Sequence, residues 1–214
     1  MKKIVIGAIL STSLLLSACS LGTTTQDLLA NSLAKVYEEE QGYRDAQKQL
    51  AELEKKEQST FKSVMELTQE QLEEVTKKVN DLNASLDERL VLLEEENESI
   101  QGAHSALTTF DELVEDVKDE EVKASLKSLK TIMEARYEAH EVVYSEYQKL
   151  TTLQSEFYEM MSNEKTEQNK LQEQVAKVNK QNELVQSAIS EFNEATKTVN
   201  ETKTSVFDSL TEEK

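Results

Sequence analysis

The chain has 214 residues with no Pro, no Trp and only four Gly, and its formal net charge is −18. That charge excludes the basic surface that nucleic-acid binding needs. The lack of Pro removes the strongest helix breaker, and good helix formers dominate the composition. No stretch shows the alternation of apolar and polar residues that is typical of a strand. The sequence therefore predicts an all-α fold.

Residues 1–18 have the layout of a secretory signal peptide. Lys2 and Lys3 supply the positive start, and residues 4–16 are apolar over a length that is too short to span a membrane. We expect this segment to be removed from the mature protein.

The signal ends in Leu16, Ser17, Ala18 and Cys19, which resembles a bacterial lipobox with cleavage after Ala18. A diacylglyceryl group on the Cys19 thiol, with a second acylation, would anchor the protein stably at the outer face of the cell membrane. The alternative is an ordinary signal peptide with an incidental Cys. Cys19 is the only Cys, which excludes an internal disulfide or a Cys-based zinc site. Residues 19–25 then form a short tether.

The remainder, residues 26–214, is predicted to form one helical domain. Breaks near residues 67, 118 and 163 divide it into four segments of similar length joined by short loops. Short loops favour sequential antiparallel packing, so we expect a long antiparallel up-and-down four-helix bundle over residues 26–212 with no strand. If the first break is only a bend, the alternative is a three-helix bundle with a bent first helix.

Two of the breaks carry capping signals. Thr68 and Gln71 have the spacing of a capping box at the start of the second helix. Asp119, followed by two Glu residues, fits the N-terminus of the third helix.

The second segment carries a long apolar stripe with alternating steps of three and four residues. That spacing predicts one helix over residues 72–117 that turns a single narrow face toward its partners. Arg89 and Glu96 alone interrupt the stripe, which runs Leu72, Val75, Val79, Leu82, Leu86, Arg89, Leu93, Glu96, Ile100, Ala103, Leu107, Phe110, Val114, Val117.

Glu96 has a predicted partner in His140. When the second and third helices are folded back about Lys118, the two positions face each other. A hydrogen bond between them would satisfy both inside the bundle and fix its register. The same construction places Glu39 or Glu40 and Gln186 at a similar height, with Asn182 one turn away. The alternative is a metal site at this level, in which two carboxylates and the histidine hold the ion.

The third segment concentrates aromatic residues, namely Tyr137, Tyr144, Tyr147, Phe157 and Tyr158. Their near-helical spacing indicates core packing with phenol groups at the rim. A platform that stacks on wall sugars is the alternative.

The order of several short segments resembles the YkyA-like cell-wall-binding lipoproteins of Gram-positive bacteria. The resemblance implies an all-helical bundle on the outer membrane surface and no catalytic residues. It rests on the lipobox and on residues 50–57, 133–147, 156–161, 174–179 and 192–197.

No catalytic constellation is apparent. His104 and His140 fit neither a His-Glu-x-x-His motif nor a di-iron pattern, and neither a phosphate-binding loop nor a Gly-x-Ser-x-Gly elbow occurs. We therefore expect no catalytic residue, metal or cofactor, and a non-enzymatic envelope lipoprotein that binds peptidoglycan or an envelope protein. The alternatives are a coiled-coil-like scaffold at the outer membrane face that binds a protein partner or oligomerises, and a metal-dependent or hydrolytic enzyme.

Overall fold

The structure is a computed structural model and describes residues 24–212. This part of the chain contains no strand. Its helices, in chain order, are α1 (Thr25–Glu39), α2 (Gln41–Met65), the short 3₁₀ helix η1 (Gln69–Gln71), α3 (Leu72–Ala106), α4 (Thr108–Asp116), α5 (Glu120–Ser162) and α6 (Gln168–Glu212).

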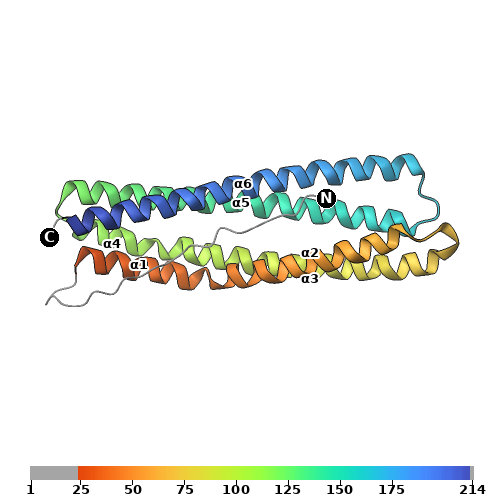
Figure 1. Cartoon of the computed structure of the whole chain (residues 1–214), viewed down its shortest axis with the longest axis horizontal. Helices are drawn as coiled ribbons and strands as arrows, with labels where there is room; N and C mark the ends of the chain where they lie inside the picture. The colour runs from red at the N-terminus through yellow and green to blue at the C-terminus, as the bar shows by residue number, and fades with distance from the viewer. Residues whose placement is uncertain (1–23, 213–214) are drawn as a thin grey trace.

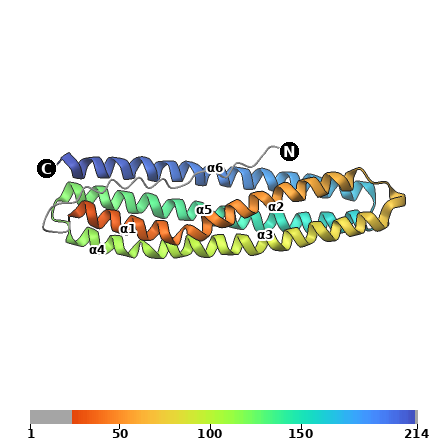
Figure 2. The ribbon, with the colours of Figure 1, turned by 60° about the horizontal axis from the view of Figure 1, so that its bottom comes forward.

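These helices form four long antiparallel rods (Figure 1). The first rod is α1 followed by α2, the second is α3 followed by α4, and α5 and α6 are the third and fourth. Figure 2 shows that α5 and α6 make one hairpin and the first two rods make the other. The two hairpins meet mainly where α3 packs on α5. The predicted four-helix bundle is confirmed.

The break between the first and second rods, which distinguishes a four-helix bundle from a three-helix bundle, lies where it was predicted. α2 ends at Met65, and Thr68 forms a capping box with Gln71. The backbone N–H of Thr68 donates to Oε1 of Gln71 at 3.1 Å. At the next break, the Asp119 carboxylate accepts from the backbone N–H groups of Glu121 and Val122 at 2.9 and 3.0 Å, which caps α5.

The predicted stripe of the second rod faces the interior. Leu72 and Val75 at its start are half-buried, and every later member through Val117 is buried. Arg89 and Glu96 are buried with the apolar residues, at 3% and 1% exposure. The interior therefore contains charged groups that need partners within the protein.

The first rod bends at Glu40, where the sequence predicted one continuous helix. Ser99 of α3 causes this bend, because its hydroxyl is inserted into the helical hydrogen-bond ladder. The Tyr43 N–H donates to Ser99 Oγ at 2.9 Å, and Ser99 Oγ donates to the Glu39 carbonyl. Gly42 makes the close approach possible, since a Cβ there would lie 3.0 Å from the Ser99 Cβ.

The second rod also differs from the prediction, because α3 and α4 are separated at Leu107. The Leu107 and Phe110 N–H groups donate three residues back, at 3.1 and 2.9 Å, which tightens the turn. The hydroxyls of Thr108 and Thr109 also bond to carbonyls three residues earlier, a pattern that bends helices. The stripe nevertheless stays inside on both sides of the break.

Candidate functional site: three buried polar layers

The predicted lipidation site cannot be placed, because Leu16, Ser17, Ala18 and Cys19 lie outside the described residues. The signal segment 1–18 lies outside them too. Of the expected tether only the last two residues are described, and Thr25 already belongs to α1, whose N-cap is Thr24.

Glu96 of α3 and His140 of α5 are in contact, as the folding-back argument predicted. The His140 Nε2 lies 2.7 Å from Glu96 Oε1, and each side chain is 1% exposed. The Gln47 amide of α2 donates to the other carboxylate oxygen, Oε2. Because a carboxylate accepts, the His140 proton in this bond sits on Nε2. The His140 Nδ1 is buried and has no hydrogen-bond partner among residues 24–212.

Aromatic rings enclose His140 from two other helices. Tyr43 of α2 and Phe192 of α6 pack edge-on against its ring, at centroid distances of 5.9 and 5.4 Å. Phe192 thus takes the α6 position at this height that the sequence assigned to Gln186. Gln186 is half-buried, as is Asn182, which was expected one turn away. The pKa of Tyr43 is raised, first by burial and then by the Glu96 carboxylate.

A second layer lies about one helical turn away and centres on Arg136 of α5. Its Nη1 donates to Glu40 Oε1 at 2.6 Å, and its Nε donates to the Thr196 hydroxyl of α6 at 2.9 Å. The Tyr137 hydroxyl also donates to Glu40 Oε1, at 3.3 Å. Burial raises the pKa of Tyr137, and the Glu40 carboxylate adds to the effect. Glu40 was predicted at the height of Glu96, but it pairs with Arg136 instead.

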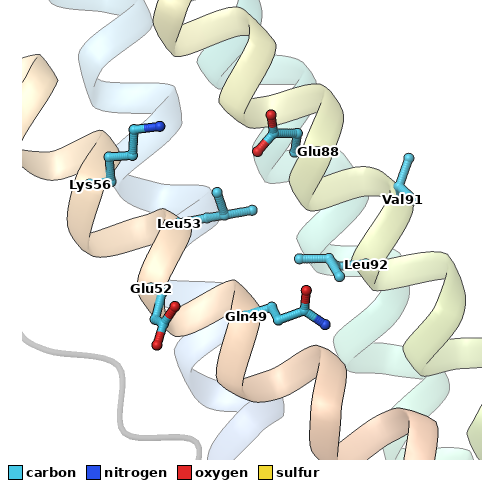
Figure 3. Close-up of a pocket in the computed structure, with 7 residues that line it drawn as sticks. All are labelled: Gln49, Glu52, Leu53, Lys56, Glu88, Val91 and Leu92. Atoms are coloured by element: carbon cyan, nitrogen blue, oxygen red, sulfur yellow. The ribbon is translucent and has the colours of Figure 1, made fainter.

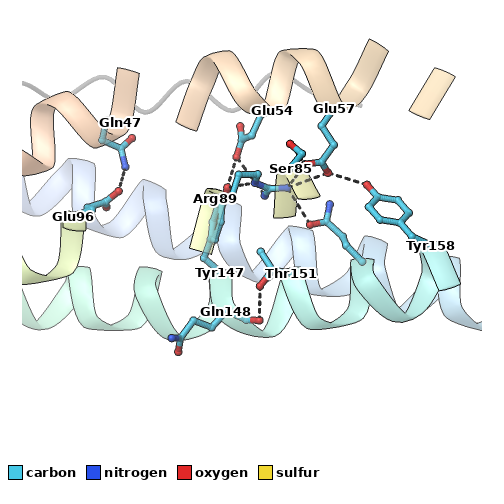
Figure 4. A network of polar contacts seen from close by, with 11 residues as sticks. Gln47, Glu54, Glu57, Ser85, Arg89, Glu96, Tyr147, Gln148, Thr151 and Tyr158 are labelled. Carbon is cyan, nitrogen blue, oxygen red and sulfur yellow. Dashed lines mark hydrogen bonds and ion pairs between the residues drawn. The ribbon is translucent and has the colours of Figure 1, made fainter. Parts of the chain in front are cut away.

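The third layer surrounds Arg89 of α3 (Figure 4). Its Nη1 donates to both oxygens of Glu57 of α2, at 3.0 and 2.9 Å, and its Nε donates to the Tyr147 hydroxyl of α5 at 2.8 Å. The Tyr147 hydroxyl donates onward to Glu54 at 2.7 Å, and the Tyr158 hydroxyl donates to Glu57 at 2.8 Å. Each of these groups therefore has a hydrogen-bond partner from a different helix.

The pKa values in this third layer follow from burial and charge. Burial lowers the pKa of Arg89, but the Tyr147 hydroxyl and the two carboxylates outweigh it and the net shift is upward. The pKa of Tyr147 and that of Tyr158 are both raised, chiefly by burial. Arg89 therefore stays charged and both phenols stay neutral over the ordinary pH range.

These layers join the helices, because their buried charged groups pair with groups on other helices. No group of three or more His, Cys, Asp or Glu residues within 24–212 is arranged to hold a metal ion. The other histidine, His104, stacks on the Tyr137 ring at 5.3 Å and is not part of the Glu96 pair.

Comparison with known proteins adds to this architecture. The chain matches the YkyA family, described as "Putative cell-wall binding lipoprotein", over residues 24–209. The chain belongs to the YkyA family. The "Uncharacterized lipoprotein YkyA" of Bacillus subtilis (strain 168) is 28% identical over 203 residues, which cover 95% of this chain and 91% of that protein.

A solved structure has a similar fold. The crystal structure of a conserved protein of unknown function from Staphylococcus aureus has a TM-score of 0.75 at 17% identity, covering 90% of this chain and 97% of that one. At that identity the similarity concerns the fold. Among the described residues, no helix is both long enough and apolar enough to cross a membrane.

Sequence reasoning found Glu96, His140 and Arg89 but missed Arg136 and Glu57. Arg136 carried a usable signal, because it stands on the same three–four repeat as Met133 and His140. Glu57 carried a weaker one, since it lies a full heptad after Leu50 within a charged run. Neither signal names a partner, because both partners lie on other helices.

Proposed function

We propose that this protein is a non-enzymatic lipoprotein, held at the outer face of a Gram-positive cell membrane by lipid on Cys19, that binds cell-wall material. The observation that carries the anchor is the single Cys of the chain, which stands directly after an apolar signal segment and completes the Leu16–Cys19 lipobox. Membership of a family described as wall-binding lipoproteins supports the wall as ligand.

The structure supports a binding role over a catalytic one. The buried pairs Arg89–Glu57, Arg136–Glu40 and His140–Glu96 are shielded from solvent. A general acid or base has to reach its substrate within hydrogen-bond distance, and buried pairs of this kind cannot do so. What the protein offers its surroundings is a long helical surface.

Charge sets a condition on wall binding. The chain carries −18, and loss of residues 1–18 removes Lys2 and Lys3 and no acid, which makes the mature chain about −20. Anionic wall polymers would be repelled by that surface. Divalent cations that bridge carboxylates on both sides would remove the repulsion, so we expect wall binding to require magnesium.

Retention on purified peptidoglycan, with magnesium and with a chelator, tests the ligand. We expect the protein to be retained with magnesium and released by the chelator. Retention that is equal in both conditions would show that cations are not needed, and no retention in either would remove the wall as ligand. A helical protein of similar net charge serves as the control for nonspecific adsorption.

Replacement of Cys19 tests the anchor separately. In cells fed a palmitate analogue, the wild-type chain should take up label and stay with the membrane. The Cys19→Ala chain should be unlabelled and be found in the medium or as an unprocessed precursor. Ser20→Ala, one residue later, is the matched control and should behave as wild type. Label that persists in Cys19→Ala would contradict lipidation there.

A further inference from the structure

The outer side of the α2–α3 pair has a hollow with an apolar floor (Figure 3). Its volume is about 460 Å³. Leu53 of α2 and Leu92 of α3 point toward each other across it, and Val91 stands at its edge with 59% of its surface exposed. Leu90, the residue before Val91, is also exposed. The rim is formed by Gln49, Glu52, Lys56 and Glu88.

The lining residues have the spacing of a helix-binding groove. On α2 they stand at positions 49, 52, 53 and 56, and on α3 at 88, 91 and 92. These are steps of three and four residues, so each helix presents one continuous ridge along the hollow. A third helix laid between two such ridges places its own apolar residues at the same spacing into the space between them.

The α3 side of the hollow is acidic, and its charge favours one kind of occupant. Between Val79 and Val117 the chain contains one Lys or Arg, which is Arg89, and Arg89 is buried against Glu57. Among the residues that the structure describes, one exposed acid of this stretch forms an ion pair: Asp111 pairs with Lys130. The exposed acids are Asp81, Asp87, Glu88, Glu94, Glu95, Glu98, Asp111, Glu112, Glu115 and Asp116.

We propose that the α2–α3 groove docks a basic amphipathic helix of another protein. Apolar residues of that helix would cover Leu53, Val91 and Leu92, while its Lys and Arg residues would face the acids of α3 and α4. A second copy of this chain that placed its α3 against this α3 would bring two acidic helix surfaces together, which is unfavourable. This inference goes beyond wall binding and does not depend on it.

The test uses a synthetic amphipathic peptide with Leu at positions i, i+3, i+4 and i+7 and Lys on the flanking positions. Its affinity for the full chain is measured by fluorescence anisotropy at moderate salt with no anionic lipid present. A scrambled peptide of the same composition carries the same charge but no apolar stripe. We expect the striped peptide to bind at least about tenfold more tightly than the scrambled one.

Two lysine substitutions locate the binding site. Val91→Lys places a charge in the groove and should weaken binding of the striped peptide by about tenfold or more. Val142→Lys is the matched control, because Val142 of α5 is also exposed, at 48%, and also has acidic neighbours, Glu138 and Glu141. Its affinity for the peptide should stay within about twofold of wild type. Circular dichroism confirms that both variants are folded.

Three results would overturn the proposal. Equal binding of the scrambled peptide would show that charge alone attracts it. Equal weakening by Val91→Lys and Val142→Lys would place the binding elsewhere. Light scattering that shows a dimer which Val91→Lys abolishes would assign the groove to a second copy of this chain.

Discussion

Arg136 and Glu40 lie 96 residues apart in the chain, and their side chains meet inside the bundle at 2.6 Å. Both side chains are 2% exposed. Glu40 occupies the bend between α1 and α2 that the Ser99 hydroxyl creates. The bend and the ion pair thus occupy the same level of the bundle, and a change in one is expected to be felt by the other.

Removal of one partner of the Arg136–Glu40 pair is predicted to destabilise the protein strongly, whereas replacement of both partners by apolar residues is predicted to have little effect on the free energy of unfolding. Arg136→Met leaves the Glu40 carboxylate buried without its cation, so the free energy of unfolding should fall by about 3–5 kcal/mol. In the double variant Arg136→Met/Glu40→Leu most of that loss should be recovered. Urea unfolding followed by circular dichroism measures both.

The pair of half-buried Lys130 with exposed Asp111, at the surface of the bundle, is the control for this measurement. Lys130→Met should change the free energy of unfolding by no more than about 1 kcal/mol, because surface ion pairs contribute little. If Arg136→Met has an equally small effect, the buried pair does not hold the hairpins together.

The Glu96–His140 pair should behave in the same way. His140→Phe leaves Glu96 with only the Gln47 amide, and we expect a loss of about 2–4 kcal/mol in unfolding free energy. The double variant His140→Phe/Glu96→Met should recover most of it. The matched control is His104→Phe, because His104 stacks on Tyr137 and is outside the buried pair. A loss of the same size in His104→Phe would point to a general effect of histidine replacement.

The same double variant tests the role of the layer in setting register. With an apolar layer, the helices lose the contact that singles out one alignment. We expect the double variant to be stable but to show faster amide hydrogen exchange in α3 and α5 than wild type. Unchanged exchange would mean that the apolar stripe alone sets the register.

Two glycines should respond to alanine in opposite directions. Gly102→Ala should raise the free energy of unfolding by up to about 1 kcal/mol, because Ala favours helix and the nearest atom is the mobile end of Glu39, at 2.8 Å. Gly42→Ala places its Cβ 3.0 Å from the Ser99 Cβ, which is fixed close to the backbone. It should give no gain or a loss. Thermal unfolding compares the two, and a gain at Gly42 would show that the close approach is not needed.

Alkaline pH should unfold the protein through its buried phenols. The pKa values of Tyr137, Tyr147 and Tyr158 in the folded protein are raised above 10.0. Their contribution to stability is therefore fully present below pH 10 and is lost as pH rises above it, because the unfolded chain releases the protons first. The free energy of unfolding should be flat near neutral pH and fall above about pH 10.

Absorbance of the phenolate measured alongside circular dichroism checks this prediction. For the buried phenols, phenolate should appear together with the loss of helix. Tyr158→Phe should make the decline in stability less steep. Phenolate that forms fully in a chain that is still helical would show that these hydroxyls are accessible to base.

Sequence patterns predicted those parts of the fold that depend on residues close together in the chain. The stripe through Val117, the capping box at Thr68 and the cap at Asp119 each depend on residues close together in sequence. The bend at Glu40 could not be read in the same way, because its cause, Ser99, lies on another helix. A helix interrupted by a distant hydroxyl looks continuous in sequence.

The contacts within the polar layers could be predicted only where the turn between the two helices is tight. The α4–α5 turn is tight, so folding the chain back about Lys118 placed Glu96 on His140 correctly. The α5–α6 connection is longer, with α5 ending at Ser162 and α6 beginning at Gln168. The centre of that turn is therefore displaced along the chain, and Phe192 faces His140 where Gln186 was expected.

The start of α1 lies at the same end of the rod as the α4–α5 turn (Figure 1). The longest helix, α6, has 45 residues and spans roughly 70 Å. If Cys19 is lipidated as proposed and the bundle stands upright on the membrane, that end would face the bilayer and the turn at η1 would point away from it. Val91 would then stand about 40 Å above the lipid surface, counting along the helix from Val117. The distance between the groove and the lipid surface is then set by helix length. Insertion of a heptad in all four rods would move a docked partner farther from the bilayer, and deletion of a heptad would move it nearer. The docking residues would stay the same.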